Sequence, residues 1–478
     1  MALLKHLDSL LLAAVLILCY ALTLAPGLTW ANGGADGGDL IAAAATGGVA
    51  HPTGYPLYLL LAHTFQAVPF GILAFRTNLL SAVCTVLAAL ALQALLRRQT
   101  DARASALIAA LAFGLAPAVW SQAVISEVYG LQSLLLVLLL FGLLEEKLPG
   151  GDWMRGLVFG LALSNHITTL LLLPLLQLRF APQLGFAGPV SLAKRGLACL
   201  LGLSLYLTLP LRASSHPPIN WGNPTTPEAF WWLVSGHLYA TYPFGITWPE
   251  AVLRLRVVAG LLLEQFTLPG VLIGIYGFFS GIPWRILLAS FWVFLSFVCF
   301  AIFYASYDSQ VYLIAAYLAF AFWLTWGLRD ILSAFSVRFP RLMRFAVILT
   351  LATLAVRIPF TFPRVDASQD RRAEEFGARF VASAPQGSLV FASGDEAVFG
   401  LWYFHHALNQ RPDVIVIADE LLSYSWYAAT LAQTYPSLRI SPSGGVSRPE
   451  VIADNPNRPI CYVTSEAANA GQFCGTHP

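Results

Sequence analysis

Charged residues are scarce in this chain of 478 amino acids. Lys, Arg, Asp and Glu together make up 11% of the sequence, whereas hydrophobic residues make up 57%. A soluble globular domain carries charge on about a quarter of its residues, so the composition excludes a chain that is soluble throughout. A net charge of +2 also argues against nucleic acid as a partner, because a protein surface that binds nucleic acid is strongly basic. The composition therefore predicts a protein that lies mostly in a bilayer.

Cysteine is also rare, with six residues in the chain. Four of them fall in hydrophobic runs, where cysteine behaves as a small apolar residue: Cys19, Cys84, Cys199 and Cys299. The other two, Cys461 and Cys474, fall in a polar C-terminal region, and their spacing matches no metal motif. We predict a disulfide between them, on the oxidising side of the membrane.

Long hydrophobic runs, by contrast, are frequent. A helix needs about 20 apolar residues to cross a bilayer, and the runs predict about eleven transmembrane helices. They lie at residues 8–26, 78–96, 104–119, 128–144, 155–165, 167–180, 196–212, 258–280, 285–304, 311–328 and 343–361. The pair at 155–165 and 167–180 is short and is alternatively one broken element. We interpret the first run as a retained helix rather than a secretory signal, because many more runs follow.

Positive charges are unequally distributed between the predicted loops. With the N-terminus in the cytoplasm, most of them fall on the cytoplasmic side: Lys5, Arg97, Arg98, Arg103, Lys147, Arg155, Arg179, Lys194, Arg195, Arg285, Arg329, Arg338, Arg341 and Arg344. The outer loops keep Arg76, Arg212, Arg254 and Arg256. This bias is the positive-inside pattern. It predicts that the first loop, the 213–256 loop and everything after 361 lie outside, in a bacterial periplasm or in the lumen of the endoplasmic reticulum.

The C-terminal region, residues 362–478, has a mixed composition typical of a soluble domain. Short β-rich runs alternate there with helix-like stretches: 388–392, 413–418 and 460–464 against 368–383, 395–408 and 420–434. This alternation predicts a small, largely parallel α/β domain outside the membrane. Ser393-Gly394-Asp395 lacks the further glycines of a dinucleotide fingerprint, so we favour a turn and helix cap over a nucleotide site.

The first outer loop, residues 27–77, holds two carboxylates in the run Asp36-Gly-Gly-Asp39, followed by His51-Pro-Thr-Gly-Tyr-Pro56. No Lys or Arg occurs between Lys5 and Arg76 to neutralise them. A charge beside a bilayer is costly unless it faces water, a partner or a substrate. The glycines and prolines favour tight turns over a continuing helix. We interpret this loop as a catalytic loop at the membrane surface.

Further polar residues fall at the outer ends of other predicted spans. They are Glu127, Tyr129, His166, Arg212, Asn220, Trp221, Asp308, Gln310 and Tyr312. Each has a simple structural interpretation by itself: Glu127 faces water, His166 bonds a backbone carbonyl, and Arg212 extends toward lipid headgroups. Their position on one side of the membrane favours a shared cavity at the outer leaflet.

Such a cavity suits a lipid-linked substrate, because nucleotide sugars are scarce outside and the sequence has no ATP-binding loop. A carboxylate of the first loop then acts as general base on an acceptor hydroxyl. The Arg212 region holds the lipid phosphate, which leaves. A divalent cation between Asp36, Asp39 and Asp308 is an alternative, but a base-only site needs no metal, and we expect none.

These motifs resemble those of a known family. The run from Asp36 to Pro56 is similar to the acid–Gly–acid and His-Pro-x-Gly-Tyr-Pro signature of a membrane family once catalogued as a domain of unknown function, which includes the animal O-mannosyltransferase of plexin-type receptors. Further matching segments are Trp120…Glu127-Val-Tyr129, Asn165-His166, Leu209-Pro-Leu-Arg212…Ile219-Asn-Trp-Gly-Asn-Pro224, Ser393-Gly-Asp395…Leu401-Trp-Tyr403…Arg411-Pro-Asp413 and Ser425-Trp-Tyr427. The first loop also resembles the wider GT-C superfamily of lipid-phosphate-sugar glycosyltransferases.

The resemblance implies a polytopic helical GT-C fold, a polyprenyl- or dolichyl-phosphate sugar donor such as polyprenyl-phosphate mannose, and a Ser or Thr acceptor on a protein, or a glycan. It maps the catalytic acids to Asp36, as base, and Asp39, as support. We assign the donor and its phosphate to His51, Tyr55, Glu127, His166, Arg212, Asp308 and Gln310. Acceptor or loop contacts are assigned to Asn220, Trp221, Tyr129 and Tyr312.

Two other classes of function stay open at this point. A transporter or lipid flippase would need polar residues through the middle of the membrane and interrupted helices in paired halves. Here the ionisable groups gather at one end of the predicted spans. A non-catalytic receptor or scaffold would use the C-terminal domain for binding.

Overall fold

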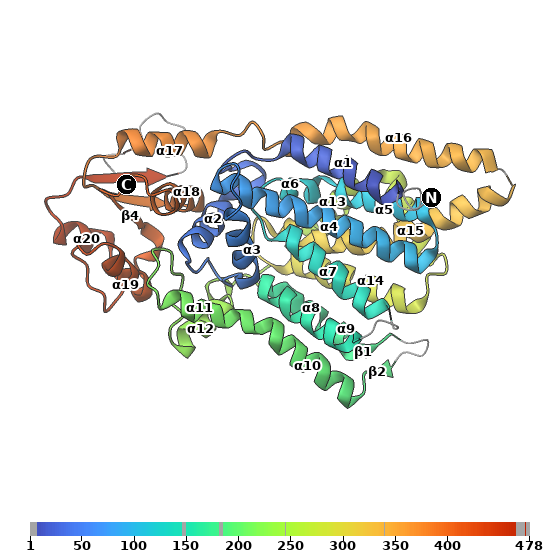
Figure 1. The fold of residues 1–478 in the computed structure, drawn as a ribbon, viewed down its shortest axis with the longest axis horizontal. Helices are drawn as coiled ribbons and strands as arrows, with labels where there is room; N and C mark the ends of the chain where they lie inside the picture. The colour runs from blue at the N-terminus through green and yellow to red at the C-terminus, as the bar shows by residue number, and fades with distance from the viewer. Residues whose placement is uncertain are drawn as a thin grey trace.

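The computed structural model describes residues 7–145, 150–180, 185–243, 245–338, 340–464 and 474. A bundle of long helices forms most of the molecule, and a smaller unit with a β-sheet lies at one end of it (Figure 1). Two residues used to predict the orientation, Lys5 and Lys147, lie outside the described residues.

The bundle contains the long helices of the chain. They are α1 (Leu7–Thr23), α4 (Leu73–Thr100), α5 (Arg103–Gly114), α7 (Tyr129–Leu144), α8 (Gly151–Asn165), α10 (Pro189–Leu203), α13 (Trp248–Phe279), α14 (Trp284–Phe303), α15 (Leu313–Arg338) and α16 (Pro340–Val365). Among the candidate membrane spans, α15 is the most buried, and it packs against α13, α14, α5 and α16. α16 runs along the outside of the bundle beside α1 (Figure 1).

Shorter elements connect these helices. They are α2 (Gly37–Thr46) and α3 (Pro56–Gln66) in the first loop, α6 (Pro117–Ala123), α9 (Leu173–Gln177), α11 (Thr208–Ala213), α12 (Pro227–Val234), and the small antiparallel pair β1 (Leu178–Arg179) and β2 (Gly185–Phe186).

Six helices in the described part of the chain are long and apolar enough to cross a membrane, and α5 with α6 adds a seventh if that bent pair is one span. The predicted count of eleven is therefore not confirmed. The predicted span at 104–119 is broken, because α5 ends at Gly114 and Pro117 begins α6 at an angle of 63°. The pair at 155–165 and 167–180 is interrupted at His166, whose backbone is extended. Three further apolar helices, Leu7–Thr23, Tyr129–Leu144 and Ile167–Gln177, are shorter.

The C-terminal unit contains a parallel sheet. Its strands are β3 (Leu389–Ser393), β4 (Ile415–Ala418) and β5 (Ile460–Thr464), in the order β4-β3-β5. They fall where the sequence predicts them. The connecting helices are α17 (Arg372–Ser383), α18 (Asp395–Trp402), α19 (Ser425–Thr434) and α20 (Arg448–Asp454). A disulfide joins Cys461 of β5 to Cys474, as predicted.

The sheet-containing unit shares its hydrophobic core with the first loop. Buried residues of α2 and α3 form one continuous cluster with those of α17, α18 and the three strands. The backbone of α18 passes so close to α2 that a Cβ on Gly38 would lie 2.5 Å from the carbonyl oxygen of Phe399. Asp370, just before α17, also binds the first loop, because its Oδ2 accepts hydrogen bonds from the backbone nitrogens of Trp30 (2.9 Å) and Ala31 (2.8 Å). The first loop is thus held between the bundle and the sheet.

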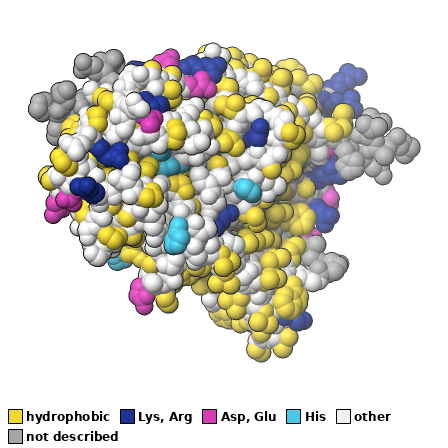
Figure 2. Space-filling model, turned by 60° about the vertical axis from the view of Figure 1, so that its left-hand side comes forward, with side chains coloured by type: hydrophobic (Ala, Val, Ile, Leu, Met, Phe, Trp, Pro, Cys, Tyr) yellow, Lys and Arg dark blue, Asp and Glu magenta, His cyan; other side chains and the backbone are white. Residues whose placement is uncertain are grey.

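The two parts of the molecule differ in surface character. In Figure 2, hydrophobic side chains gather over the bundle toward the right and the lower edge, whereas the end that holds the sheet shows fewer of them, with charged side chains and His among the white atoms. Exposed leucines on α10 and α13, such as Leu200 and Leu253, belong to the hydrophobic part. This distribution fits helices that face lipid and a sheet that faces water.

Candidate active site

The two acids of the first loop have different surroundings. Asp39 lies in the first turn of α2 and is fully buried. Its Oδ2 accepts a hydrogen bond from the backbone nitrogen of His51 (2.9 Å) and lies 2.7 Å from His51 Nδ1. Its Oδ1 accepts from the indole nitrogen of Trp221 at 3.1 Å. Buried carboxylates need such partners, and the N-terminus of a helix further favours the anion.

A tight turn brings His51 back over Asp39. The backbone nitrogen of Gly54 donates to the carbonyl of His51 at 2.8 Å, and Gly54 has a φ of 86°, which a residue with a side chain rarely adopts. Pro56 then begins α3. The His-Pro-Thr-Gly-Tyr-Pro run therefore places one imidazole against one carboxylate.

Asp36 immediately precedes α2, and its side chain is 42% exposed. Its Oδ2 lies 3.7 Å from His51 Nε2, so the imidazole stands between the two acids. Removal from bulk water raises the pKa of Asp36 to about 6; His51 lowers this pKa, whereas Asp395, Asp39 and Asp308 raise it further.

Electrostatics favour the charged form of His51. Burial disfavours the imidazolium, but the carboxylates of Asp36 and Asp39 outweigh burial and raise the pKa of His51 to about 9. At neutral pH the ring is therefore a cation paired to both acids. The phenyl ring of Phe399, from α18, stacks on it with a centroid separation of 6.2 Å.

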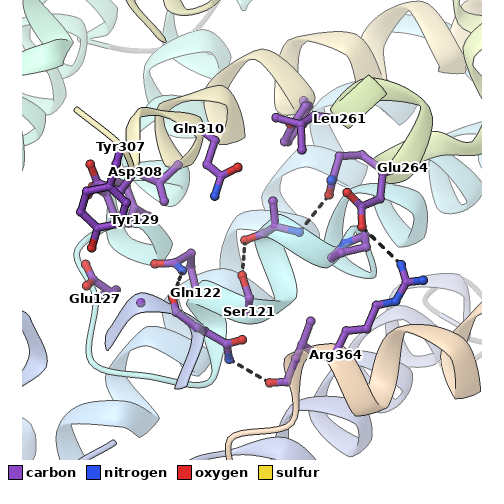
Figure 3. A pocket seen from close by; sticks show the side chains of 18 of the residues that line it. Ser121, Gln122, Glu127, Tyr129, Leu261, Glu264, Tyr307, Asp308, Gln310 and Arg364 are labelled. Carbon is purple, nitrogen blue, oxygen red and sulfur yellow. Dashed lines mark hydrogen bonds and ion pairs between the residues drawn. The ribbon is translucent and has the colours of Figure 1, made fainter. Parts of the chain in front are cut away.

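Asp36 lines a cavity of about 450 Å³. The walls come from the first loop, α6, the start of α7, α13, the 304–312 loop and the end of α16. Among the residues that the sequence assigns to the site, the cavity brings together Asp36, Glu127, Tyr129, Asp308 and Gln310. Figure 3 shows Glu127, Tyr129 and Asp308 at one end, and Glu264 with Arg364 at the other.

Glu127 does not face open water, in contrast to its simple interpretation, but is 6% exposed. Burial raises its pKa well above the usual value, and Asp36 raises it further. This shift favours the protonated form of Glu127 in the cavity wall, and that form can donate a hydrogen bond to a bound ligand.

His166 lies beside the main cavity rather than in its lining. With Tyr129 and Tyr312 it lines a second, smaller cavity, and its ring is 6.1 Å from that of Tyr55. Its Nδ1 accepts from the backbone nitrogen of Thr168 at 3.2 Å, so it caps the following turn instead of bonding a carbonyl. Burial lowers the pKa of His166 to about 4, which keeps the ring neutral.

Arg212 and two neighbours lie apart from both cavities. The Arg212 guanidinium donates to the carbonyl of Gly48 at 3.2 Å. Asn220 donates to the side chain of Asn223, at 3.1 Å, and Trp221 is buried behind Asp39. In this structure Arg212 therefore supports the first loop, and the lining of the main cavity contains neither it nor Trp221.

Several cavity residues escaped the sequence analysis. Glu264 and Gln265 lie within a predicted span, and Arg364 lies just beyond another. Arg254 also matters, because its guanidinium binds the loop that carries Asp308, with Nη1 2.6 Å from the carbonyl of Tyr304. The signal for Glu264 was a single acid inside an apolar run, which is costly unless it is paired or functional.

Within the part of the chain that the structure describes, no group of three His, Cys, Asp or Glu side chains is arranged to hold a metal ion.

Two family models match the chain. The model described as the Protein O-mannosyl-transferase TMEM260 N-terminal domain matches residues 36–182, and TMEM260-associated domain 2 matches residues 373–442. Protein O-mannosyl-transferase TMEM260 of Mus musculus is 26% identical over 448 residues, which cover 85% of this chain and 62% of the relative. The protein of the same name in Dictyostelium discoideum is 21% identical, over 90% of this chain and 59% of the relative. The chain thus spans about three fifths of the length of these curated relatives.

A solved structure shares the fold. ArnT from Cupriavidus metallidurans, in its crystal structure bound to undecaprenyl phosphate, superposes with a TM-score of 0.61 at 12% identity and covers 97% of this chain and 94% of that one. The apo form of the same protein superposes equally well.

The fold and the helices that can cross a membrane make this a multi-pass integral membrane protein with the GT-C architecture. In residues 36–182 and 373–442 the chain is similar to the protein O-mannosyltransferases of the TMEM260 type.

Proposed function

We propose that this protein is an inverting glycosyltransferase that moves a sugar, mannose or another hexose, from a polyprenyl-phosphate donor to an acceptor hydroxyl, on a Ser or Thr of a protein. The observation that carries the proposal is the position of Asp36. Its carboxylate faces the cavity while a charged His51 and a buried Asp39 stand behind it. The family match and the GT-C fold support the same reaction class.

Asp36 acts as the general base. Its carboxylate accepts the proton of the acceptor hydroxyl as the oxygen attacks the anomeric carbon of the sugar. The bond from that carbon to the phosphate oxygen breaks, and the lipid phosphate leaves with the electron pair. A single displacement of this kind inverts the anomeric configuration.

His51 and Asp39 position the base. The imidazolium holds the Asp36 carboxylate in place and limits the rise of its pKa, so that the anion predominates at neutral pH. Asp39, with no exposed surface, keeps the ring in one orientation through two contacts to His51. Preorganised charges of this kind avoid reorganisation during the reaction.

We also propose the topology. The cavity and the sheet-containing unit lie on the extracytoplasmic side and the N-terminus lies in the cytoplasm, as the distribution of Lys and Arg favours. The sheet-containing unit borders the first loop and is our candidate for acceptor contacts.

The test is a transfer assay with protein in lipid nanodiscs, undecaprenyl-phosphate mannose as donor and a Ser/Thr-rich peptide as acceptor, scored by glycopeptide mass. We expect Asp36→Asn to lower the rate by about 10²- to 10⁴-fold, the usual contribution of a general base. Asp101→Asn removes an exposed acid at the end of α4 and is the matched control. Transfer by an Asp36→Asn, Asp39→Asn double variant at the wild-type rate would reject the mechanism.

A further inference from the structure

One cation lines the large cavity. Among the described residues around it, four carry carboxyl groups (Asp36, Glu127, Glu264 and Asp308) and Arg364 is the single Lys or Arg. A lipid phosphate would be repelled by such a lining unless a cation received it. Arg212, which the sequence favours for this task, is bound to Gly48 outside the lining.

Arg364 reaches the cavity from the end of α16 and meets α13 there. Its Nη1 lies 3.3 Å from Oε1 of Glu264, and both side chains are exposed, at 67% and 42%. Figure 3 shows this pair at the far end of the cavity from Glu127. An exposed ion pair is weak, so the guanidinium can exchange Glu264 for another anion at little cost.

The helix break beside Glu264 explains why Arg364 can bind a ligand, whereas Arg357, the other arginine of α16 near this break, cannot. α13 departs from helical geometry at Thr267, which has a φ of 61°, and Pro269 has no N–H for the carbonyl of Gln265. Arg357 binds this unpaired backbone instead, donating to the carbonyls of Gln265 at 2.9 Å and Glu264 at 2.7 Å. Arg357 is thus committed to the fold, whereas Arg364 has a replaceable side-chain partner.

The junction of α13 and α16 is also accessible from the bilayer. The apolar stretches of both helices are largely unburied in the protein, so their outer faces contact the bilayer. The cavity wall includes Leu261, Glu264 and Gln265 of α13 together with Arg364 and Val365 of α16. A polyprenyl chain can therefore lie in the bilayer while its headgroup enters between these two helices.

We propose that Arg364 is the phosphate-anchoring residue for the lipid donor, that the lipid enters between α13 and α16, and that its phosphate displaces Glu264 from Arg364. This inference rests on the proposed function, since it names the residue that holds the phosphate of that donor. A guanidinium binds phosphate and carboxylate with the same two-pronged geometry, so one can replace the other directly.

The test measures lipid binding without transfer. The full-length protein in nanodiscs is titrated with undecaprenyl phosphate and, separately, with undecaprenol, and the bound fraction is read by native mass spectrometry. We expect Arg364→Gln to weaken binding of undecaprenyl phosphate about ten- to hundredfold, the usual cost of losing a hydrogen bond to a charged group, and to leave undecaprenol binding unchanged. Arg364→Lys should restore part of the affinity, and Glu264→Gln should leave it equal or increase it. Arg256→Gln, which removes an exposed charge from the same helix as Glu264, is the matched control.

The inference would be overturned if Arg364→Gln bound undecaprenyl phosphate with wild-type affinity. It would also be overturned if Arg212→Gln, and not Arg364→Gln, lost this binding. A structural defect in Arg364→Gln would weaken undecaprenol binding as well, and this outcome also counts against the inference. The transfer assay is scored separately. If Arg364→Gln loses phosphate-dependent binding but the wild-type protein never transfers mannose, the role of Arg364 is supported and the proposed function is rejected. If mannose is transferred and the transfer does not depend on Arg364, the proposed function is supported and the role of Arg364 is rejected.

Discussion

Nδ1 of His51 lies 2.7 Å from Oδ2 of Asp39, and the backbone nitrogen of His51 donates to the same oxygen at 2.9 Å. One buried carboxylate thus fixes both the ring and the main chain of the histidine. The opposite ring nitrogen faces Asp36 at 3.7 Å. The two acids of the loop therefore have separate tasks, and each can be tested by itself.

The pH dependence of transfer should follow Asp36. Since its pKa is raised to about 6, kcat/KM should fall about tenfold for each pH unit below that value, because the base becomes protonated. His51→Gln removes the cation that lowers this pKa, so the acid limb should move to higher pH. The check is a pH profile of the transfer assay for both proteins. An acid limb that stays in place in His51→Gln would contradict the assigned pairing.

Stability should fall on the alkaline side because of His51. Its folded-state pKa of about 9 exceeds the ordinary value of 6.5, so its stabilising contribution is complete below pH 6.5 and is lost as the pH rises through 9. Its size is roughly 3 kcal/mol, from 1.36 kcal/mol per pKa unit. Thermal unfolding in detergent at pH 6 and pH 9.5 measures the loss. His51→Gln should show a smaller difference between the two pH values; an equal difference would assign the effect to other groups.

Removal of the buried acid should cost more than removal of its indole partner. Asp39→Ala leaves the His51 imidazolium buried without its closest anion, so we expect a loss of about 3–5 kcal/mol in unfolding free energy. Trp221→Phe removes the 3.1 Å hydrogen bond to Asp39 and part of a ring that packs among other aromatic side chains, and it should cost about 1–3 kcal/mol. Denaturant titration followed by tryptophan fluorescence at the remaining indoles compares the two. Equal losses would show that packing, not charge, dominates this contact.

The close approach of α2 and α18 predicts a strong effect of a single methyl group. A Cβ at position 38 would meet backbone atoms of Phe399 at 2.5 Å and 2.6 Å, so Gly38→Ala should force the sheet-containing unit away from the first loop. We expect a cost of about 1–3 kcal/mol, as for overpacking elsewhere. Gly196→Ala, on α10, has no atom within 4 Å of its new Cβ and should be neutral or slightly stabilising. Limited proteolysis between α16 and α17 should increase in Gly38→Ala and not in the control.

The parts of the site that the sequence could predict are those close together in the chain. Asp39 and His51 are 12 residues apart, and a turn with glycine and proline joins them, so the motif itself carries the geometry. The strands of the sheet could also be predicted from the sequence, because each is a short apolar run next to a helical stretch.

The missed parts depend on contacts between distant helices. Glu264 and Arg364 are 100 residues apart, and no local pattern in either helix shows that they meet. The direction of the Arg212 side chain likewise depends on a distant partner, the carbonyl of Gly48, which no local pattern shows. The break before Pro117 was also missed, because hydropathy alone does not register a bend between two apolar helices.

The stacking of Phe399 on His51 links the sheet-containing unit to the candidate active site. The ring belongs to α18 and stacks on the buried imidazole. A polypeptide that docked on this unit and shifted α18 would hydrate His51, weaken its grip on Asp36 and so change the proton affinity of the base. Under the proposed function, docking of an acceptor protein on this unit would therefore alter the base before any hydroxyl reached it.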